Sequence, residues 1–490
     1  MRNTTLKLLG AVYICCWVMS CSDKKDSGGG TAFNPNQDIV IEDFYPDSGG
    51  IATPMIIEGK NFGADTTGLS VYFVDEDQVR RKGGLVSSNG EKLYVYVPSG
   101  LTYKRNIDLV VERKMPGKEE VYSGKSSHPF IYKTQTAVTT VIGQVSTNSQ
   151  PTKPGNDLNT TTLSSPGFIC LDDEENLFIV ERNFDFGDIR KGPDIYCQKT
   201  DGSRSKGNVL RASLIKKDIV MLSENQIVYP NAPVFSDEVG LETVYVPGDT
   251  GMEFLAMAKT TGYQPRKLLA LKNEQNPEID KDNWKYCFVV NKNDKQIYTV
   301  MWKGQLVRIN PKTRRTEVLL KKIGVRGGSD SYIAFSPKEP NKLFICLCDL
   351  HEIWTVDLDD LPNKDKENYH GERYAGRACW EGTTAGYGWE DGLLRNAQFK
   401  YPRQICFTND GKLYIADSGN ACIRTIDTTL PQDKAIVTTP IGIPGSHGHQ
   451  DGGPDIAKFN FPKGIAVSHD GQTVYVADTH NRVIRKLSIE

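Results

Sequence analysis

The sequence predicts an all-β protein, a small β-sandwich followed by a six-bladed β-propeller. Short alternating strands separated by Gly, Pro and Asn, and an internal repeat near the carboxy terminus, carry this prediction. At 490 residues the chain exceeds one ordinary core, since domains typically run roughly 100–200 residues. Its 38% hydrophobic and 24% charged composition, with a formal net charge of −2, excludes disorder as the main state.

The first element, residues 1–20, is predicted to be a lipoprotein signal peptide. Arg2 and Lys7 precede an apolar run over residues 8–19, about half the ~20 residues that span a bilayer. Residues 18–21 resemble the bacterial lipobox, which makes Cys21 the expected lipidation site. Residues 21–37 then form a polar, glycine-rich tether after the lipidated cysteine. The short acidic patch after Cys21, Asp23 and Asp26 with Lys24 and Lys25 between them, resembles the surface-export signal of Bacteroidetes lipoproteins. This resemblance implies an outer-membrane lipid anchor that faces the extracellular side.

Residues 38–134 are predicted to form the sandwich. Five alternating runs, with turn residues between them, lie at residues 39–41, 55–57, 69–73, 93–97 and 107–111. Residues 45–50, 57–63, 97–98 and 129–132 resemble the IPT/TIG family of immunoglobulin-like domains, which implies a spacer role. In physical terms, Gly59 and Gly63 bracket a tight turn that lets Phe62 fill one end of the sandwich.

The rest of the chain, residues 135–490, is organised by repeats. One motif recurs with a spacing of 60 residues that becomes 61 after one insertion, and this spacing indicates stacked or radial units. Asp391, Phe399, Pro402, Asp417, Asn420 and Arg424 recur as Asp451, Phe459, Pro462, Asp478, Asn481 and Arg485. The order of strands and turns within one unit describes a four-stranded propeller blade and resembles the NHL repeat.

This template places six inner strands near residues 167–171, 232–236, 286–290, 332–336, 403–407 and 463–467. The last blade lacks its fourth strand, because the chain ends after the third. Residues 137–143 match residues 436–442, so strand 137–143 is expected to complete the last blade and close the propeller.

The distribution of charged residues and the positions of the cysteines argue against two classes of function, nucleic-acid binding and metal binding. Lys+Arg 59 and Asp+Glu 61 nearly cancel and are interspersed, which argues against nucleic acid as a partner. Six cysteines are interpreted as buried thiols in strands, and no metal or cofactor is expected. They are Cys170, Cys287, Cys346, Cys348, Cys406 and Cys422.

Candidate ligand residues gather on one predicted face of the propeller, called the top face below. Exposed aromatic rings beside carboxylates and amides suit sugars. The aromatic candidates are Trp284, Trp302, Trp380, Tyr387 and Trp389, and the polar candidates are Arg182, His351 and His480, with Asp349 also on this face. Asp417, Asn420, Asp478 and Asn481 recur between blades, which favours turn formation over recognition.

Three functions remain open. Resemblance to Bacteroidetes lipoproteins of this layout implies a glycan-binding accessory of a polysaccharide uptake system, with an outer-membrane transporter complex as partner. A protein-interaction scaffold at the cell surface is the alternative. A propeller lyase or hydrolase is a third, since His447 and His449 could join His351 and His480 in a metal site, but the glycine between the first two indicates a flexible loop. No catalytic residues are assigned.

Overall fold

The structure is a computed structural model that divides into two compact units, residues 1–133 and 134–490. It describes residues 30–50, 53–75, 78–98, 101, 106–132, 136–148, 150–182, 206–248, 252–270, 287–324, 329–378 and 386–488. The predicted signal peptide and Cys21 lie outside these ranges. Within them, no helix is both long and apolar enough to cross a bilayer.

The first unit contains two sheets. One has the order β1 (Val40–Tyr45), β3 (Pro54–Gly63), β7 (Gly90–Tyr96), β6 (Gly84–Ser88). The other has the order β2 (Ser48–Gly49), β10 (Phe130–Tyr132), β8 (Asn106–Lys114), β4 (Leu69–Val74), β5 (Arg80–Lys82), with β9 (Val121–Lys125) also paired to β8. All pairs are antiparallel except β2 with β10.

A single hydrophobic core joins these two sheets. In β8, residues 107, 109 and 111 alternate inward and are fully buried, as the period-two pattern predicts. Phe62 is fully buried in the same core. A side chain on Gly59 would meet the Val40 carbonyl oxygen at 2.0 Å, and Gly63 adopts a φ of 78°, so both positions require glycine.

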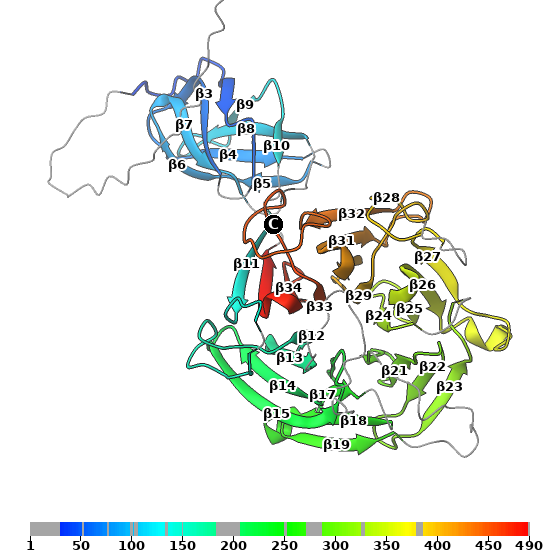
Figure 1. Cartoon of the computed structure of the whole chain (residues 1–490). Helices are drawn as coiled ribbons and strands as arrows, with labels where there is room; N and C mark the ends of the chain where they lie inside the picture. Colours follow the sequence, from blue (N-terminus) through cyan, green and yellow to red (C-terminus); the bar gives the residue numbers. More distant parts are fainter. Residues whose placement is uncertain are drawn as a thin grey trace, which may run out of the picture. The chain divides into compact units, whose positions relative to one another are not determined.

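The described residues of the second unit form six sheets. Figure 1 shows these sheets arranged around a common centre. The first three are β12 (Pro166–Leu171), β13 (Asn176–Arg182), β14 (Lys206–Ser213), β15 (Asp218–Val228); β16 (Val234–Ser236), β17 (Thr243–Pro247), β18 (Glu253–Ala258), β19 (Pro265–Leu269); and β20 (Val289–Val290), β21 (Ile297–Val300), β22 (Leu306–Ile309), β23 (Thr316–Leu320).

The next two sheets are β24 (Ser331–Phe335), β25 (Lys342–Leu347), β26 (Glu352–Asp357), β27 (Glu372–Ala375); and β29 (Pro402–Phe407), β30 (Lys412–Asp417), β31 (Cys422–Asp427), β32 (Ile436–Ile441), β28 (Gly392–Leu393). The sixth contains β33 (Pro462–Val467), β34 (Thr473–Asp478), β35 (Val483–Ser488) and β11 (Ala137–Ile142). A strand lies at or within two or three residues of each of the six predicted inner-strand positions.

The sixth sheet joins the two ends of this unit. Strand β11 lies beside the carboxy-terminal strands, drawn in red in Figure 1. It pairs antiparallel with β35, with Val138 opposite Leu487 and Thr140 opposite Arg485. The expected pairing of strand 137–143 with the last blade is therefore present. It covers the β35 edge, which would otherwise present unpaired backbone groups.

The inner strands of neighbouring sheets meet at the centre of the unit. The Gln404 amide of β29 donates to the Ile169 carbonyl of β12 at 2.8 Å and accepts from the amides of Ile169 and Ile465, both at 3.2 Å. Phe168 of β12 stacks on Tyr332 of β24, with ring centroids 5.2 Å apart. These side chains therefore fill the space between the inner strands at the centre of the unit.

Candidate functional site

Neighbouring strands of each sheet run in opposite directions. The turn between the second and third strands therefore lies at the same end of the sheet as the segment that precedes the first, innermost strand. These ends form the top face of the 134–490 unit. Arg182 closes β13, and His351 and His480 lie in the turns after β25 and β34. The three polar candidates therefore occupy equivalent ends of three different sheets.

Each of these three side chains packs against an aromatic residue that precedes an inner strand. The Arg182 guanidinium lies 4.9 Å from the Tyr229 ring centroid, and His351 lies edge-on to Tyr401 at 4.7 Å. His480 lies 4.6 Å from Phe461. The three aromatic residues share a positive φ of 44–50°. This strained turn directs the chain into the inner strand and supports the polar side chain.

Both histidines are held neutral near pH 7. Burial, together with the nearby Lys400 charge, lowers the pKa of His351 to about 4. Burial and the charges of Lys463 and Arg482 lower the pKa of His480 to about 3. His351 Nδ1 accepts the Tyr401 backbone amide at 3.0 Å, so this ring also fixes the backbone.

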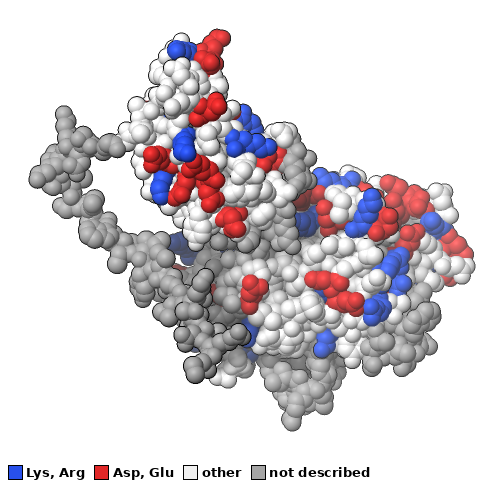
Figure 2. Space-filling view, turned by 90° about the horizontal axis from the view of Figure 1, so that it is seen from above, with Lys and Arg blue, Asp and Glu red and all other residues white. Residues whose placement is uncertain are grey.

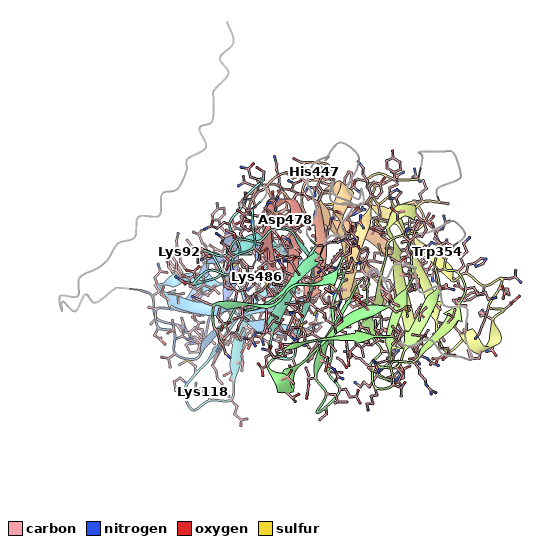
Figure 3. All side chains as sticks on the ribbon, turned by 60° about the horizontal axis from the view of Figure 1, so that its bottom comes forward. Lys92, Lys118, Trp354, His447, Asp478 and Lys486 are labelled. Atoms are coloured by element: carbon pink, nitrogen blue, oxygen red, sulfur yellow. The ribbon has the colours of Figure 1, made fainter. Side chains whose placement is uncertain are left out.

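His447 stacks on Phe461 with ring centroids 4.4 Å apart, whereas His449 bonds to Thr140 of β11 at 2.8 Å. Figure 3 labels His447, together with Asp478. Over the described ranges, no group of three His, Cys, Asp or Glu is arranged to hold a metal ion.

The aromatic candidates differ in exposure. Tyr387 and Trp389 are exposed, at 41% and 48%, and Tyr387 lies 5.2 Å from the His351 ring. The Trp389 indole donates to the Thr439 hydroxyl at 3.0 Å, which fixes its orientation. Trp302 packs partly buried against the hydrophobic core. Trp284 and Trp380 lie outside the described residues.

The recurring polar residues form a buried network in each of the last two sheets. Asp417 Oδ2 accepts from Asn420 and from Arg424, both at 2.8 Å. Its Oδ1 also accepts the Lys400 backbone amide. The equivalent Asp478 accepts from Asn481 and Arg485 at the same distances. These side chains are engaged in fixing the turn and its preceding segment.

Sequence reasoning missed two basic residues at the starts of inner strands, which lie near the predicted candidate Arg182. Arg403 and Lys463, the second residues of β29 and β33, are only 1% and 2% exposed. Arg403 Nη1 donates to Asp330 Oδ2 at 2.6 Å and to the Tyr332 hydroxyl at 3.4 Å. Arg182 Nη1 donates to Asn231 Oδ1 at 3.1 Å. We call Arg182, Arg403 and Lys463 the basic cluster.

Burial and mutual repulsion act on this cluster. Burial and the charges of Arg403 and Arg182 lower the pKa of Lys463 to about 7. Burial and the Arg182 charge lower the pKa of Arg403 to about 9. A signal was present in the repeat, since Pro402-Arg403 aligns with Pro462-Lys463, so both repeats begin the inner strand with a basic residue.

One face of the molecule shows mixed charge among the described residues. In the face that Figure 2 shows, Lys and Arg side chains are interspersed with Asp and Glu among the described residues.

Comparison with protein families shows that the chain contains NHL repeats, matched over residues 399–426 and 459–485. A 103-residue segment is 32% identical to SUPPRESSOR OF QUENCHING 1 of Arabidopsis thaliana, covering 21% of this chain and 9% of that protein. A 107-residue segment is 33% identical to NHL repeat-containing protein 2 of Gallus gallus, covering 21% of this chain and 14% of that protein. The chain thus matches less than a sixth of the length of these curated relatives.

Solved structures match nearly the whole chain. An auxiliary nutrient binding protein of Bacteroides ovatus has a TM-score of 0.60 at 19% identity, covering 94% of this chain and 100% of that one. An auxiliary nutrient binding protein of Bacteroides thetaiotaomicron has a TM-score of 0.57 at 21% identity, covering 94% and 99%. At these identities the likeness establishes the fold, an all-β chain with a propeller-like NHL-repeat unit.

Proposed function

We propose that this chain is a lipid-anchored binding protein of the bacterial outer-membrane surface, with a six-bladed propeller that binds a glycan on its top face. The first unit, an IPT/TIG-like sandwich on this reading, holds the propeller away from the membrane. A polysaccharide uptake system, including an outer-membrane transporter, is the proposed context. The shared fold with auxiliary nutrient binding proteins of Bacteroides supports this proposal.

One observation carries the glycan assignment. Among the described residues of the second unit, Tyr387 and Trp389 are the exposed Phe, Tyr or Trp side chains, and the Trp389 ring is held by its bond to Thr439. A fixed, exposed ring loses little conformational entropy when a sugar stacks on it. The His351 ring lies 5.2 Å from the Tyr387 ring, so a polar side chain packs behind one of the two exposed rings.

The test measures binding of the purified protein to a panel of plant and host polysaccharides by calorimetry. Trp389→Ala and Tyr387→Ala are expected to weaken binding of any bound polysaccharide at least about tenfold, as for interface hot spots. Tyr96→Ala and Tyr94→Ala, at 48% and 41% exposure in the first unit, are matched controls and should bind normally. Absence of binding across the panel, or equal losses in the controls, would overturn the proposal.

The anchor is tested separately. Cys21→Ser is expected to move the protein from the membrane fraction to the soluble fraction, because acyl chains contribute about 0.8 kcal/mol per buried methylene. Protease treatment of intact cells should degrade the unmodified protein if it faces outward. Retention of Cys21→Ser in the membrane, or full protection of the unmodified protein, would contradict this part.

A further inference from the structure

Two loops of the top face carry rings in the same pattern. Residues 386–390 belong to the fifth sheet and precede β28, and residues 446–450 lie 60 residues later, before β33 of the sixth sheet. Each loop contains a ring, a glycine and a second ring, Tyr387-Gly388-Trp389 in the first and His447-Gly448-His449 in the second. The two loops therefore occupy equivalent positions of the repeat on neighbouring sheets.

The two central glycines are held by the same contacts. The amides of Gly388 and Gly448 each donate to the carbonyl of the phenylalanine eleven residues later, at 3.1 and 3.0 Å. Their carbonyls accept from the side-chain amides of Asn420 and Asn481, at 2.7 and 2.8 Å. The φ angles of the two glycines are 155° and 157°. The glycine between the two histidines is thus part of a hydrogen-bonded turn, rather than of the flexible loop expected from the sequence.

The second ring of each loop bonds to the fourth strand of its sheet. Trp389 Nε1 donates to the Thr439 hydroxyl of β32 at 3.0 Å, and His449 Nε2 lies 2.8 Å from the Thr140 hydroxyl of β11. The first ring of each loop, Tyr387 or His447, is exposed. Because the following glycine and the second ring are fixed, the backbone that carries each exposed ring is held in the same way in both sheets.

Other rings support each exposed ring. Tyr387 packs against His351, whose own ring lies edge-on to Tyr401, the residue before β29. In the sixth sheet the repeat equivalent of Tyr401 is Phe461, and His447 stacks on it with ring centroids 4.4 Å apart. We call Tyr387, His351 and Tyr401 the first ring cluster.

The corresponding group in the sixth sheet also has three rings. Phe461 lies 4.6 Å from His480 as well as against His447, and we call these three residues the second ring cluster. Burial and the Lys400 charge lower the pKa of His447, and burial and the Lys463 charge lower the pKa of His480, so both rings are neutral near pH 7. A neutral imidazole has one N–H donor and one bare nitrogen acceptor, which suits sugar hydroxyl groups because these both donate and accept.

The two ring clusters lie on the same face of neighbouring sheets. The inner strands β29 and β33 of these sheets are joined by the Gln404 side chain, which accepts the Ile465 amide at 3.2 Å. Lys400, in the segment before β29, acts on both clusters, since its charge lowers the pKa of His351 in the first and of His447 in the second. Charges act over about 10 Å at ordinary ionic strength, so both clusters lie near this lysine.

We propose that the second ring cluster is a further glycan-binding subsite, equivalent to the one at Tyr387 and Trp389, and that one extended oligosaccharide occupies both. This inference rests on the proposed function and specifies the length of glycan that the top face recognises. An exposed ring that is already held by packing loses little conformational entropy when a sugar stacks on it. One chain that fills two subsites binds more tightly than at either alone, because its second contact forms within the complex.

The experiment measures affinity against oligosaccharide length by calorimetry on the purified protein. Chains of two and of six units are titrated from the xylo-, cello-, malto- and manno-oligosaccharide series. Acid-hydrolysis fragments of the same lengths are added for any other polysaccharide that the panel finds bound.

Four variants accompany the unmodified protein. His447→Ala removes the exposed ring of the second cluster, and Tyr387→Ala removes that of the first. His447→Tyr places the ring of the first loop in the second loop. His469→Ala is the matched control, because this exposed histidine lies in the same sheet, between β33 and β34, at the opposite end from His447.

In a series that binds, we expect the six-unit chain to bind at least about tenfold more tightly than the two-unit chain. His447→Ala and Tyr387→Ala should each weaken binding of the six-unit chain at least about tenfold, whereas His447→Ala should change that of the two-unit chain by less than about threefold. His447→Tyr should keep the six-unit affinity within about threefold, and His469→Ala should bind as the unmodified protein does. Since His447 is exposed, the Tm of His447→Ala should fall by less than about 3 °C, which separates lost binding from lost folding.

Three results would overturn the inference and leave the proposed function standing. The first is six-unit binding that Tyr387→Ala weakens and His447→Ala does not. The second is equal affinity for two-unit and six-unit chains, since a single subsite would then account for binding. The third is a loss for His469→Ala as large as that for His447→Ala, because the effect would not be local. Failure of every oligosaccharide and of the polysaccharide panel would instead remove the proposed function itself, and this inference with it.

Discussion

Arg485→Met is expected to destabilise the propeller-like unit strongly, because Arg485 joins four parts of the last sheet. Its Nη1 donates to Asp478 at 2.8 Å and to the Lys458 carbonyl at 3.1 Å. Its Nη2 donates to the Gln450 carbonyl at 2.9 Å and to Asp451. Methionine retains much of the apolar stem and removes all four bonds.

The size of the expected destabilisation follows from the burial of Asp478, the ion-pair partner of Arg485. Asp478 is fully buried, and burial raises its pKa to about 6 despite the Arg485 charge. Removing one member of a buried ion pair costs about 3–5 kcal/mol, because the other charge stays desolvated. Asp451 is 40% exposed and can be hydrated, so it adds little. We expect a loss of about 3–5 kcal/mol in the free energy of unfolding.

The double variant Arg485→Met, Asp478→Asn isolates the charge. It removes the orphaned carboxylate while keeping an acceptor for Asn481 and the Asn460 amide, so it should be about 1–2 kcal/mol more stable than Arg485→Met. Such a recovery would distinguish lost charge compensation from lost packing.

Urea unfolding followed by tryptophan fluorescence is the assay. Residues 38–133 contain no tryptophan, whereas residues 134–490 contain five, so the signal reports the second unit. A loss below about 1 kcal/mol for Arg485→Met, or a double variant no more stable than the single one, would refute the reasoning. Arg424→Met, in the equivalent network one sheet earlier, should behave in the same way.

Three further predictions use the same assay. Lys463 has a pKa of about 7 in the folded state and of about 10.5 in the unfolded state. Between these two pH values the unfolded state binds more protons than the folded state, so the free energy of unfolding should rise with pH. Lys463→Met should be more stable than the unmodified protein by about 2–4 kcal/mol at pH 6 and equal to it near pH 10; a constant difference would contradict the assignment. The charged and titratable groups that face this lysine are Arg182, Arg403, Asp330, Cys348 and His480. Deleting residues 136–143 removes β11 with the fully buried Val138 and Ile142, whose burial contributes about 2 kcal/mol each, and should lower the unfolding midpoint sharply. Deleting residues 38–133 should leave the midpoint unchanged. A larger effect of the second deletion than of the first would argue against the β11–β35 pairing. Trp389→Ala should change stability by less than about 1 kcal/mol because the ring is half exposed, and a larger loss would disqualify it as a binding variant.

Local patterns were sufficient for much of the fold. Strand positions follow from alternation and turn residues, which act over a few neighbouring residues, and the repeat supplied the order of strands and turns within one unit. The match between residues 137–143 and 436–442 even predicted which distant strand β11 would join. In both outer strands a threonine amide bonds the same aspartate position, Thr140 to Asp451 and Thr439 to Asp391.

The exposure of the candidate aromatic residues could not be predicted from the sequence, because it depends on which distant residues pack against each ring. Trp302 and Trp389 are both tryptophans in irregular segments, yet the first packs against the core and the second is half exposed. Trp389 occupies the repeat position of His449, and both bond to a threonine of the fourth strand of their sheets, Thr439 of β32 and Thr140 of β11. The repeat thus explains the position of this ring, but not its exposure.

The sequence by itself determined the all-β class, the repeat and the pairing of the first propeller strand with the last sheet, because hydrogen-bonded strands depend on patterns that each repeat carries in full. Only the tertiary structure decided that Arg182, Arg403 and Lys463 lie close enough for their charges to act on one another. Each is a basic residue at a strand end, with no sequence pattern that links all three. Their repulsion and shared burial exist only where inner strands from separate sheets converge.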